Sequence, residues 1–318
     1  MHVTRPLLAA TALVAGLKLA SDLAVRRYEY LRLDDTEPEG SLANIEGLRI
    51  HYLDAGHGNP LVFLHGLGAS TFSFRQNLPQ LSRSFRVIVP DMPGHGRSSR
   101  AVTDLSVTAQ ARHLAALLDH LGLERVSIAG HSMGGSVAQR FAVSWPGRVE
   151  RLVLIASTTD RYMMRASPLS PPLATFIPAF ATSVLHNRRG RDRWLRRVVH
   201  VPSYLTPEIK AGYEAPGHIR GTVAAYQRLM LDRRHDQPIE LGSIQAPALI
   251  IWGDSDRVVT IDHGRRLADA IPDSRLVVLP EAGHLVQEEQ ALTVNQLIEE
   301  FVGQGSQAPA TAGATGAR

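Results

Sequence analysis

Residues 130–134, with the sequence GHSMG, constrain this chain more than any other stretch, because they match G-x-S-x-G in the setting which that motif requires. The apolar run over 125–129 predicts a buried strand before the motif, and the small residues that begin 135–144 predict a helix after it. A sharp strand-to-helix turn holds its middle residue in strained backbone, and the flanking glycines leave room for close approach. We therefore expect the Ser132 hydroxyl to stand exposed at a helix N-terminus, which stabilises a developing anion.

A serine hydroxyl needs a base to become a nucleophile, and the second half of the chain offers one. Apolar runs over 247–252 and 275–279 predict two strands, each followed by a loop that carries polar candidates. His284 lies in the second loop and is the expected base. Asp254 and Asp256 both lie in the first loop, so either could hold the imidazole, and the other is expected to serve as a turn or capping residue.

Together these motifs resemble the α/β-hydrolase superfamily, in the branch with an inserted lid that includes esterases, lipases and monoacylglycerol-lipase-like members. The resemblance runs from about Ile50 to Val302. The matching motifs are the HGxG loop at 65–68, the D-x-x-G-x-G-x-S turn at 91–98, the GHSMGG turn at 130–135 and the W-G-x-x-D-R turn at 252–257.

The resemblance implies a catalytic site and a reaction. In its register the nucleophile is Ser132, the base His284 and the acid Asp256. It also implies an oxyanion hole formed by the backbone N–H groups of Leu67 and Met133. We expect a carboxylic ester hydrolase that forms an acyl-enzyme on the serine, with a lipid-like ester such as a monoacylglycerol as a reasonable substrate.

The order of predicted elements favours the same fold class, an α/β protein with a mostly parallel central sheet, flanking helices and an inserted helical lid. Strand-like runs lie near 48–53, 60–64, 86–90, 125–129, 151–156, 247–252 and 275–279, and helical patterns lie near 107–121, 134–144, 260–270 and 288–302. With 44% hydrophobic residues over 318 positions, the chain can bury a large core.

Six segments follow from composition. They are a hydrophobic anchor or signal-like segment (1–33), a linker (34–46), the first part of the core (47–159), a lid (160–240), the second part of the core (241–302) and a disordered tail (303–318). The expected lid is rich in proline and carries 13 Lys or Arg against 7 Asp or Glu. Its arginine run over 188–197 suits either a solvated helix face or contact with a membrane surface.

The N-terminal segment leaves several interpretations open. Residues 7–17 are apolar or small, but 11 residues are too few to span a bilayer. They fit a membrane anchor or interfacial helix, a cleaved signal peptide, or a helix docked on the body. We favour membrane association, with a secreted or cytoplasmic location as the alternatives.

Other functions remain as alternatives. The stretch from Trp252 to His284 also resembles carbon–carbon bond hydrolases of ring-cleavage products, although their oxyanion loop usually carries further glycine and proline where this chain has Gly68-Ala69-Ser70. A perhydrolase or haloperoxidase would use the same triad, and a receptor could use the same pocket. Dehalogenases and epoxide hydrolases are disfavoured because they have aspartate at the position of Ser132.

The sequence predicts a small-molecule partner and no cofactor. It contains no cysteine, no CxxC and no HExxH, so no metal site is indicated. No G-x-G-x-x-G follows a first strand, and no nucleic-acid motif accompanies the basic run, so neither nucleotide nor nucleic-acid binding is expected. The sequence leaves the oligomeric state open.

Overall fold

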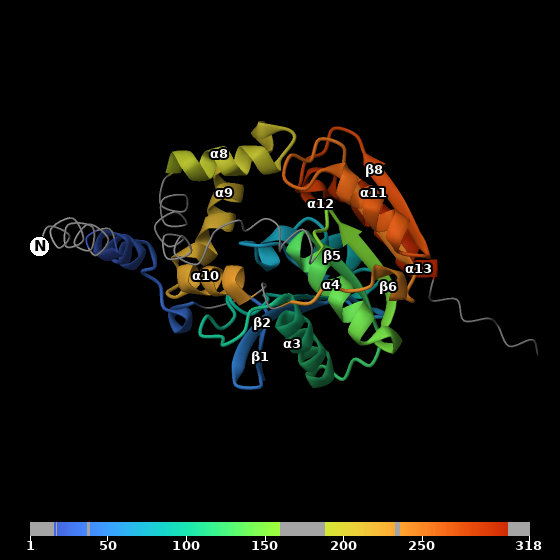
Figure 1. The fold of residues 1–318 in the computed structure, drawn as a ribbon, viewed down its shortest axis with the longest axis horizontal. Helices are drawn as coiled ribbons and strands as arrows, with labels where there is room; N and C mark the ends of the chain where they lie inside the picture. The colour runs from blue at the N-terminus through green and yellow to red at the C-terminus, as the bar shows by residue number, and fades with distance from the viewer. Residues whose placement is uncertain (1–15, 17, 37–38, 160–187, 233–235, 305–318) are drawn as a thin grey trace, which may run out of the picture.

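A computed structural model describes residues 16, 18–36, 39–159, 188–232 and 236–304, and its centre is an eight-stranded sheet (Figure 1). The strands are β1 (Ser41–Ile45), β2 (Leu48–Ala55), β3 (Pro60–Leu64), β4 (Arg86–Pro90), β5 (Val126–His131), β6 (Val149–Ile155), β7 (Ala248–Gly253) and β8 (Ser274–Leu279). Their spatial order is β1-β2-β4-β3-β5-β6-β7-β8.

Strand direction divides the sheet into two parts. The pairs β1–β2 and β2–β4 are antiparallel, whereas β3 to β8 run parallel to β4 and to one another. This mostly parallel sheet confirms the predicted fold class. Residues 41–45 were expected to belong to a linker and instead form β1. A tight turn at Glu46-Gly47, with φ of 51° and 81°, returns the chain at once into β2 and lets the two strands pair.

Helices flank the sheet and extend beyond it (Figure 1). The α-helices are α2 (Leu78–Leu81), α3 (Val107–His120), α4 (Met133–Ser144), α8 (Arg188–Val198), α9 (Pro207–Glu214), α10 (Thr222–Asp232), α11 (Ile261–Ala270), α12 (Val286–Glu289) and α13 (Ala291–Gly303). Short 3₁₀ turns are η1 (Leu33–Asp35), η2 (Thr71–Phe74), η3 (Pro146–Arg148), η4 (Pro202–Tyr204), η5 (Ala215–His218) and η7 (Leu241–Ser243).

Alternation along the strands builds a core on each face of the sheet. In β3, Val62 and Leu64 pack into the cluster shared with α3, α4 and α11, whereas Leu61 and Phe63 pack into the cluster shared with α2 and α13. Because both faces are covered, the central strands are apolar throughout, as parallel strands usually are. The catalytic candidates therefore cannot lie within the strands and must come from the loops at their ends.

Helices α8, α9 and α10 are inserted between β6 and β7, within the range predicted for the lid. We call residues 188–232 the cap. A small apolar cluster joins the cap to the loop after β8, where Leu195 and Val199 pack with Leu285. The remainder of the predicted lid, residues 160–187 and 233–235, lies outside the described residues. That these helices form a lid over the active site stays a prediction.

The N-terminal segment reaches the cap. Residues 18–28 are helical, and Leu31 forms a parallel bridge with Ile219. Within the described ranges, no helix has the length and apolarity that crossing a bilayer requires. Residues 1–15 and 17, which hold most of the apolar run over 7–17, lie outside the described part of the chain. So do residues 305–318, which hold most of the predicted disordered tail.

Candidate active site

Ser132 occupies the turn between β5 and α4, in the strained backbone that the motif predicts. Its φ of 52° and ψ of −117° place a non-glycine residue in a costly conformation. The glycines around Ser132 are required because a side chain at either position would clash with the neighbouring backbone. A Cβ at Gly130 would come within 2.4 Å of the Gly134 carbonyl oxygen, and one at Gly134 within 2.2 Å of the Leu64 carbonyl oxygen. The close packing of α4 against the sheet therefore fixes the position of the serine.

The structure brings His284 to this serine. His284 follows β8, and its Nε2 lies 3.0 Å from Ser132 Oγ. Its Nδ1 lies 2.7 Å from Asp256 Oδ2. The carboxylate accepts a hydrogen bond from Nδ1–H, which leaves Nε2 free to accept a hydrogen bond from the hydroxyl, as a general base must. Three side chains from three separate loops thus form one hydrogen-bonded chain.

The two aspartates of the loop after β7 have different surroundings. The second oxygen of Asp256, Oδ1, accepts the backbone N–H groups of Val258 at 2.7 Å and Val259 at 2.9 Å, so both oxygens are held. Asp254 is exposed and accepts a hydrogen bond from the hydroxyl of Ser255. The structure therefore places Asp256, and not Asp254, against His284.

The expected oxyanion donors lie on either side of Ser132. Met133 begins α4, and Leu67 lies in the loop after β3. A Cβ at Gly66 would come within 3.2 Å of Ser132 Cβ, so this loop passes close to the nucleophile. Within the described ranges, neither the Leu67 nor the Met133 amide donates a hydrogen bond. Both donors are thus available to an oxygen that forms beside the serine.

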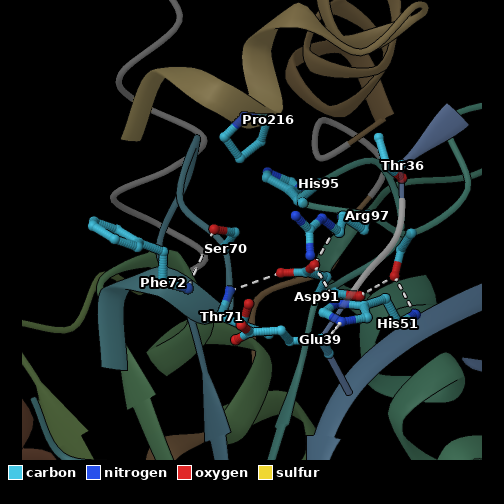
Figure 2. Close-up of polar contacts among 12 residues, drawn as sticks. Thr36, Glu39, His51, Ser70, Thr71, Phe72, Asp91, His95, Arg97 and Pro216 are labelled. Atoms are coloured by element: carbon cyan, nitrogen blue, oxygen red, sulfur yellow. Dashed lines mark hydrogen bonds and ion pairs between the residues drawn. The ribbon is translucent and has the colours of Figure 1, made fainter. Parts of the chain in front are cut away.

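A buried carboxylate anchors the loop that carries Leu67 (Figure 2). Asp91 Oδ1 accepts the backbone N–H of Thr71 at 2.7 Å, and Oδ2 accepts from His51 Nδ1 and from the Arg97 amide, each at 2.7 Å. Burial alone would raise the pKa of Asp91, but the hydrogen bond and charge of His51 outweigh it and the pKa is lowered. A Cβ at Gly96 would lie 1.9 Å from this carboxylate, which explains the glycine of the turn.

His65 holds the start of the same loop. Its Nδ1 donates to the Gly66 carbonyl at 2.9 Å, and its Nε2 accepts the Met92 amide at 3.0 Å. Burial lowers the pKa of His65, which keeps the ring neutral and preserves this donor–acceptor pattern. Both ring nitrogens of His65 are therefore used to hold this loop in place.

Sequence reasoning missed the contribution of His131, the residue before the nucleophile. Its Nε2 donates to the backbone carbonyl of His284 at 2.9 Å, and the side chain is buried. Burial and the neighbouring His284 lower the pKa of His131 to about 3. A neutral imidazole thus ties the nucleophile turn to the loop of the base. The histidine inside the motif was visible in the sequence, but its partner was not.

Sequence reasoning also missed a polar cluster between the core and the cap. Glu288 is buried; its carboxylate lies 2.7 Å from Arg75 and accepts from Tyr204 at 2.9 Å and from Tyr213. Burial raises the pKa of Glu288, against the opposing effect of Arg75. Because Glu288 follows His284 by four residues, the cluster joins the cap to the loop of the base.

Metal ligation has no candidate among the residues that the structure describes. No group of three or more histidine, aspartate or glutamate side chains is arranged to hold a metal ion there.

Comparison with known proteins agrees with the fold. The family model described as the alpha/beta hydrolase fold matches residues 59–291. The chain is 31% identical to the uncharacterized hydrolase YugF of Bacillus subtilis, covering 81% of this chain and 96% of that protein. It is also 31% identical to a 2-hydroxy-6-oxo-6-phenylhexa-2,4-dienoate hydrolase of Burkholderia cepacia, over 82% of this chain and 93% of that one.

A solved structure has the same fold. An esterase from Thermogutta terrifontis superposes with a TM-score of 0.70 at 26% identity, covering 85% of this chain and all of the esterase. The chain belongs to the α/β-hydrolase superfamily, and it is a hydrolase.

Proposed function

We propose that this protein is a serine hydrolase in which Ser132 is the nucleophile, His284 the general base and Asp256 the group that orients and stabilises the imidazole. The observation that carries the proposal is the continuous chain of two hydrogen bonds through these residues, at 3.0 and 2.7 Å, beginning on a strained strand-to-helix turn. Strain of this kind persists only where the surrounding structure enforces it, and it concentrates at functional sites.

The reaction follows from the geometry. Ser132 Oγ attacks the substrate carbonyl carbon while His284 Nε2 takes its proton, and the carbonyl oxygen becomes an anion held by the amides of Leu67 and Met133. The tetrahedral centre collapses, the bond to the leaving group breaks, and the imidazolium returns its proton to that group. Water then attacks the acyl-enzyme by the same route, releasing a carboxylic acid and restoring the serine.

The leaving group decides the substrate class, and our first candidate is a carbon leaving group. The Burkholderia cepacia relative hydrolyses 2-hydroxy-6-oxo-6-phenylhexa-2,4-dienoate, by its name. That compound carries a ketone and no ester, so its hydrolysis breaks a carbon–carbon bond. This relative supports carbon–carbon hydrolysis better than it supports the ester hydrolysis predicted from the sequence.

The second candidate is an ester, and two observations favour it. The structurally similar Thermogutta terrifontis protein is described as an esterase. The oxyanion loop of this chain continues as Gly68-Ala69-Ser70, without the further glycine and proline usual in the carbon–carbon hydrolases. Transfer of the acyl group to hydrogen peroxide, as in a perhydrolase, would need no change in the triad.

A direct comparison of substrates tests both candidates. Purified enzyme is assayed with 2-hydroxy-6-oxo-6-phenylhexa-2,4-dienoate and with p-nitrophenyl esters of graded chain length, and kcat/KM is compared. A carbon–carbon hydrolase should favour the dienoate by orders of magnitude. Preference for the esters would instead support the second candidate. Turnover of neither substrate would contradict both candidates.

Replacement of the nucleophile tests the proposal itself. Ser132→Ala should lower kcat by more than about 10⁴-fold on whichever substrate is turned over, because nucleophile and base act as a unit. Thermal stability should change little, since the hydroxyl contributes little packing. Ser255→Ala, in the loop after β7, is the matched control and should keep its activity. Retention of more than about 1% of kcat in Ser132→Ala would contradict the assignment.

A further inference from the structure

His51 is a buried histidine outside the catalytic triad, and both of its ring nitrogens face acceptors (Figure 2). Nδ1 lies 2.7 Å from Asp91 Oδ2, and Nε2 lies 2.7 Å from the backbone carbonyl oxygen of Glu39. A neutral imidazole has one N–H and can donate only one of these two hydrogen bonds. An imidazolium has two N–H groups, so the contacts of His51 fit the charged form.

The surroundings of the pair place the proton on His51 and not on Asp91. The Asp91 carboxylate accepts the backbone N–H groups of Thr71 on Oδ1 and Arg97 on Oδ2, each at 2.7 Å. Such hydrogen bonds favour the ionised carboxylate. Burial lowers the pKa of His51, as does the charge of Arg97, but the hydrogen-bond partners of the ring outweigh both and the pKa is raised. The two side chains therefore form a buried ion pair.

Backbone contacts hold the imidazole in this position. His51 lies in β2, where its backbone N–H donates to Ser98 Oγ at 2.9 Å and its carbonyl accepts the Asp91 amide at 2.9 Å. Gly40 has a φ of 107°, and a Cβ there would come within 3.2 Å of His51 Nε2. The turn before β1 therefore passes close to the ring, which brings the Glu39 carbonyl against it.

The ion pair reaches the oxyanion loop, residues 65–71, through Thr71. This residue begins η2, and its amide donates to Asp91. Near the other end of the loop, the Gly66 carbonyl accepts a hydrogen bond from His65 Nδ1 at 2.9 Å. Leu67 lies between these two fixed points. Its amide is one of the two expected oxyanion donors, so the position of that donor depends on both of them.

We propose that His51 is a positioning residue for the reaction: as a buried cation it holds the Asp91 carboxylate and thereby the oxyanion loop that carries the Leu67 amide. The inference rests on the proposed function, because the loop matters to the reaction only as an oxyanion hole. Without the charge, Asp91 would be buried without a counter-charge, and it would take up a proton or move to other partners. Either change loosens the loop. Oxyanion donors stabilise the transition state more than the bound substrate, so kcat should fall while KM changes little.

The charge of His51 is measured on the full-length protein by nuclear magnetic resonance with ¹⁵N-labelled histidine at pH 7.5. An unperturbed histidine is about nine-tenths neutral at this pH. We expect protons on both ring nitrogens of His51, in signals that disappear in His51→Asn, and a neutral pattern for the exposed His57. Ser132→Ala should give the same His51 signals, so this measurement does not depend on the proposed catalysis. A neutral His51 would overturn the proposal.

Two substitutions separate the partners of His51. The amide nitrogen of asparagine falls close to the position of Nδ1, so His51→Asn keeps a donor to Asp91 but not the charge. The amide nitrogen of glutamine falls close to Nε2, so His51→Gln keeps a donor to the Glu39 carbonyl and leaves Asp91 without one. Because the positioning acts through Asp91, kcat should fall up to about 100-fold in His51→Gln and less in His51→Asn, with KM nearly unchanged.

Two control variants distinguish positioning from loss of the fold. His57→Asn changes an exposed histidine just after β2 and should keep the wild-type kcat. Ser98→Ala removes the bond from the His51 amide at 2.9 Å and the bond to the Asp91 carbonyl at 2.6 Å, but leaves the ion pair in place. It should lower the melting temperature and keep most of kcat. A loss of kcat in Ser98→Ala equal to that in His51→Gln would overturn the proposal, as would a reversed order of the two His51 variants.

Labelling of Ser132 with a fluorophosphonate provides a readout that needs no substrate. The labelling rate should fall in the same order as kcat, and thermal melting reports which variants are folded. If His51→Gln does not fold, His51→Asn is compared with Ser98→Ala and should still lose more activity. A wild-type protein that is not labelled would contradict the proposed function. A labelled wild type with equally fast labelling of the folded His51 variants would instead overturn the positioning role alone.

Discussion

At the scale of single residues, the loop after β7 shows how contacts separate two aspartates that lie two positions apart. Asp256 is buried and uses both oxygens, one toward His284 and one toward two backbone amides. Asp254 faces solvent. The same side-chain chemistry therefore supports two different roles, and the surroundings decide which residue can hold the imidazole.

Substitution of each aspartate tests this difference. Asp256→Asn should lower kcat by about 10⁴-fold, because the amide no longer holds the base in its working tautomer. Asp254→Asn is the matched change in the same loop and should have a small effect. Steady-state kinetics of the two purified variants on one substrate decides the matter. A crippled Asp254→Asn beside an active Asp256→Asn would reverse the assignment.

His131 makes a prediction about acid stability. Its pKa is about 3 in the folded protein and near 6.5 in an unfolded chain, so between these values the unfolded chain binds a proton that the folded protein does not. Stability should therefore fall as the pH decreases from about 6.5 toward 3. Between pH 7 and pH 4.5 this residue alone should cost about 2–3 kcal/mol.

The variant His131→Gln cannot titrate and should lose that part of the pH dependence. The free energy of unfolding is measured in urea at pH 7 and at pH 4.5, and the difference is compared with the wild type. His120→Gln, an exposed histidine at the end of α3, is the control and should behave like the wild type. An unchanged pH dependence in His131→Gln would show that another group dominates.

At the scale of elements, the cap is joined to the core by polar contacts as well as apolar ones. Glu288 in α12 takes partners from the cap and from the segment after η2. Glu289 adds to this by accepting the backbone amides of His200 at 2.6 Å and Gly283 at 2.9 Å. The loop that holds His284 is therefore braced by two consecutive carboxylates.

Removal of the Glu288 charge tests this brace. Glu288→Gln leaves the half-buried Arg75 without its counter-charge, and breaking a buried pair from one side typically costs about 3–5 kcal/mol. Urea denaturation should show a loss of that order, with increased proteolysis of the cap. Glu299→Gln, whose carboxylate accepts a 3.2 Å hydrogen bond from the Gln80 side chain, should stay within about 0.5 kcal/mol of the wild type. Equal stability of both variants would refute the brace.

At the scale of the whole molecule, residues 28–31 attach the segment before β1 to the cap, and we call these residues the strap. The Glu29 carboxylate accepts the backbone amides of Gly221 at 2.7 Å and Val223 at 2.6 Å, at the start of α10. The Leu31 amide donates to the His218 carbonyl at 3.0 Å. The segment before the sheet is thus part of the fold from Tyr28 onward.

Two truncations separate the strap from the residues before it. Deletion of residues 1–17 should leave the free energy of unfolding of the cap and core nearly unchanged. Deletion of residues 1–33 removes the Glu29 contacts, and two charge-assisted hydrogen bonds at about 1.5–3 kcal/mol each should lower the stability by at least about 2 kcal/mol. Urea unfolding of both variants provides the measurement. Equal stability of the two truncations would show that the strap contributes nothing.

The sequence by itself determined the fold class and the candidate triad, because the patterns that predict them are formed by residues close together in the chain. A strand, a glycine-flanked turn and a helix around Ser132 are set by neighbouring residues, and apolar runs before Asp256 and His284 place both in loops at the same edge of a parallel sheet. Strand β1 escaped prediction because its residues gain their place from pairing with β2, which no single stretch records.

Only the tertiary structure decided the contacts between distant segments. It brought Asp256, the acid that the resemblance implies, into contact with His284, paired His131 with the carbonyl of His284, assembled the cluster around Glu288 and attached residues 28–31 to α10. Each of these joins residues that are tens to hundreds of positions apart, and their partners are selected by burial and hydrogen-bond geometry. Local pattern fixes which side chains reach the end of a strand, and packing fixes which of them meet.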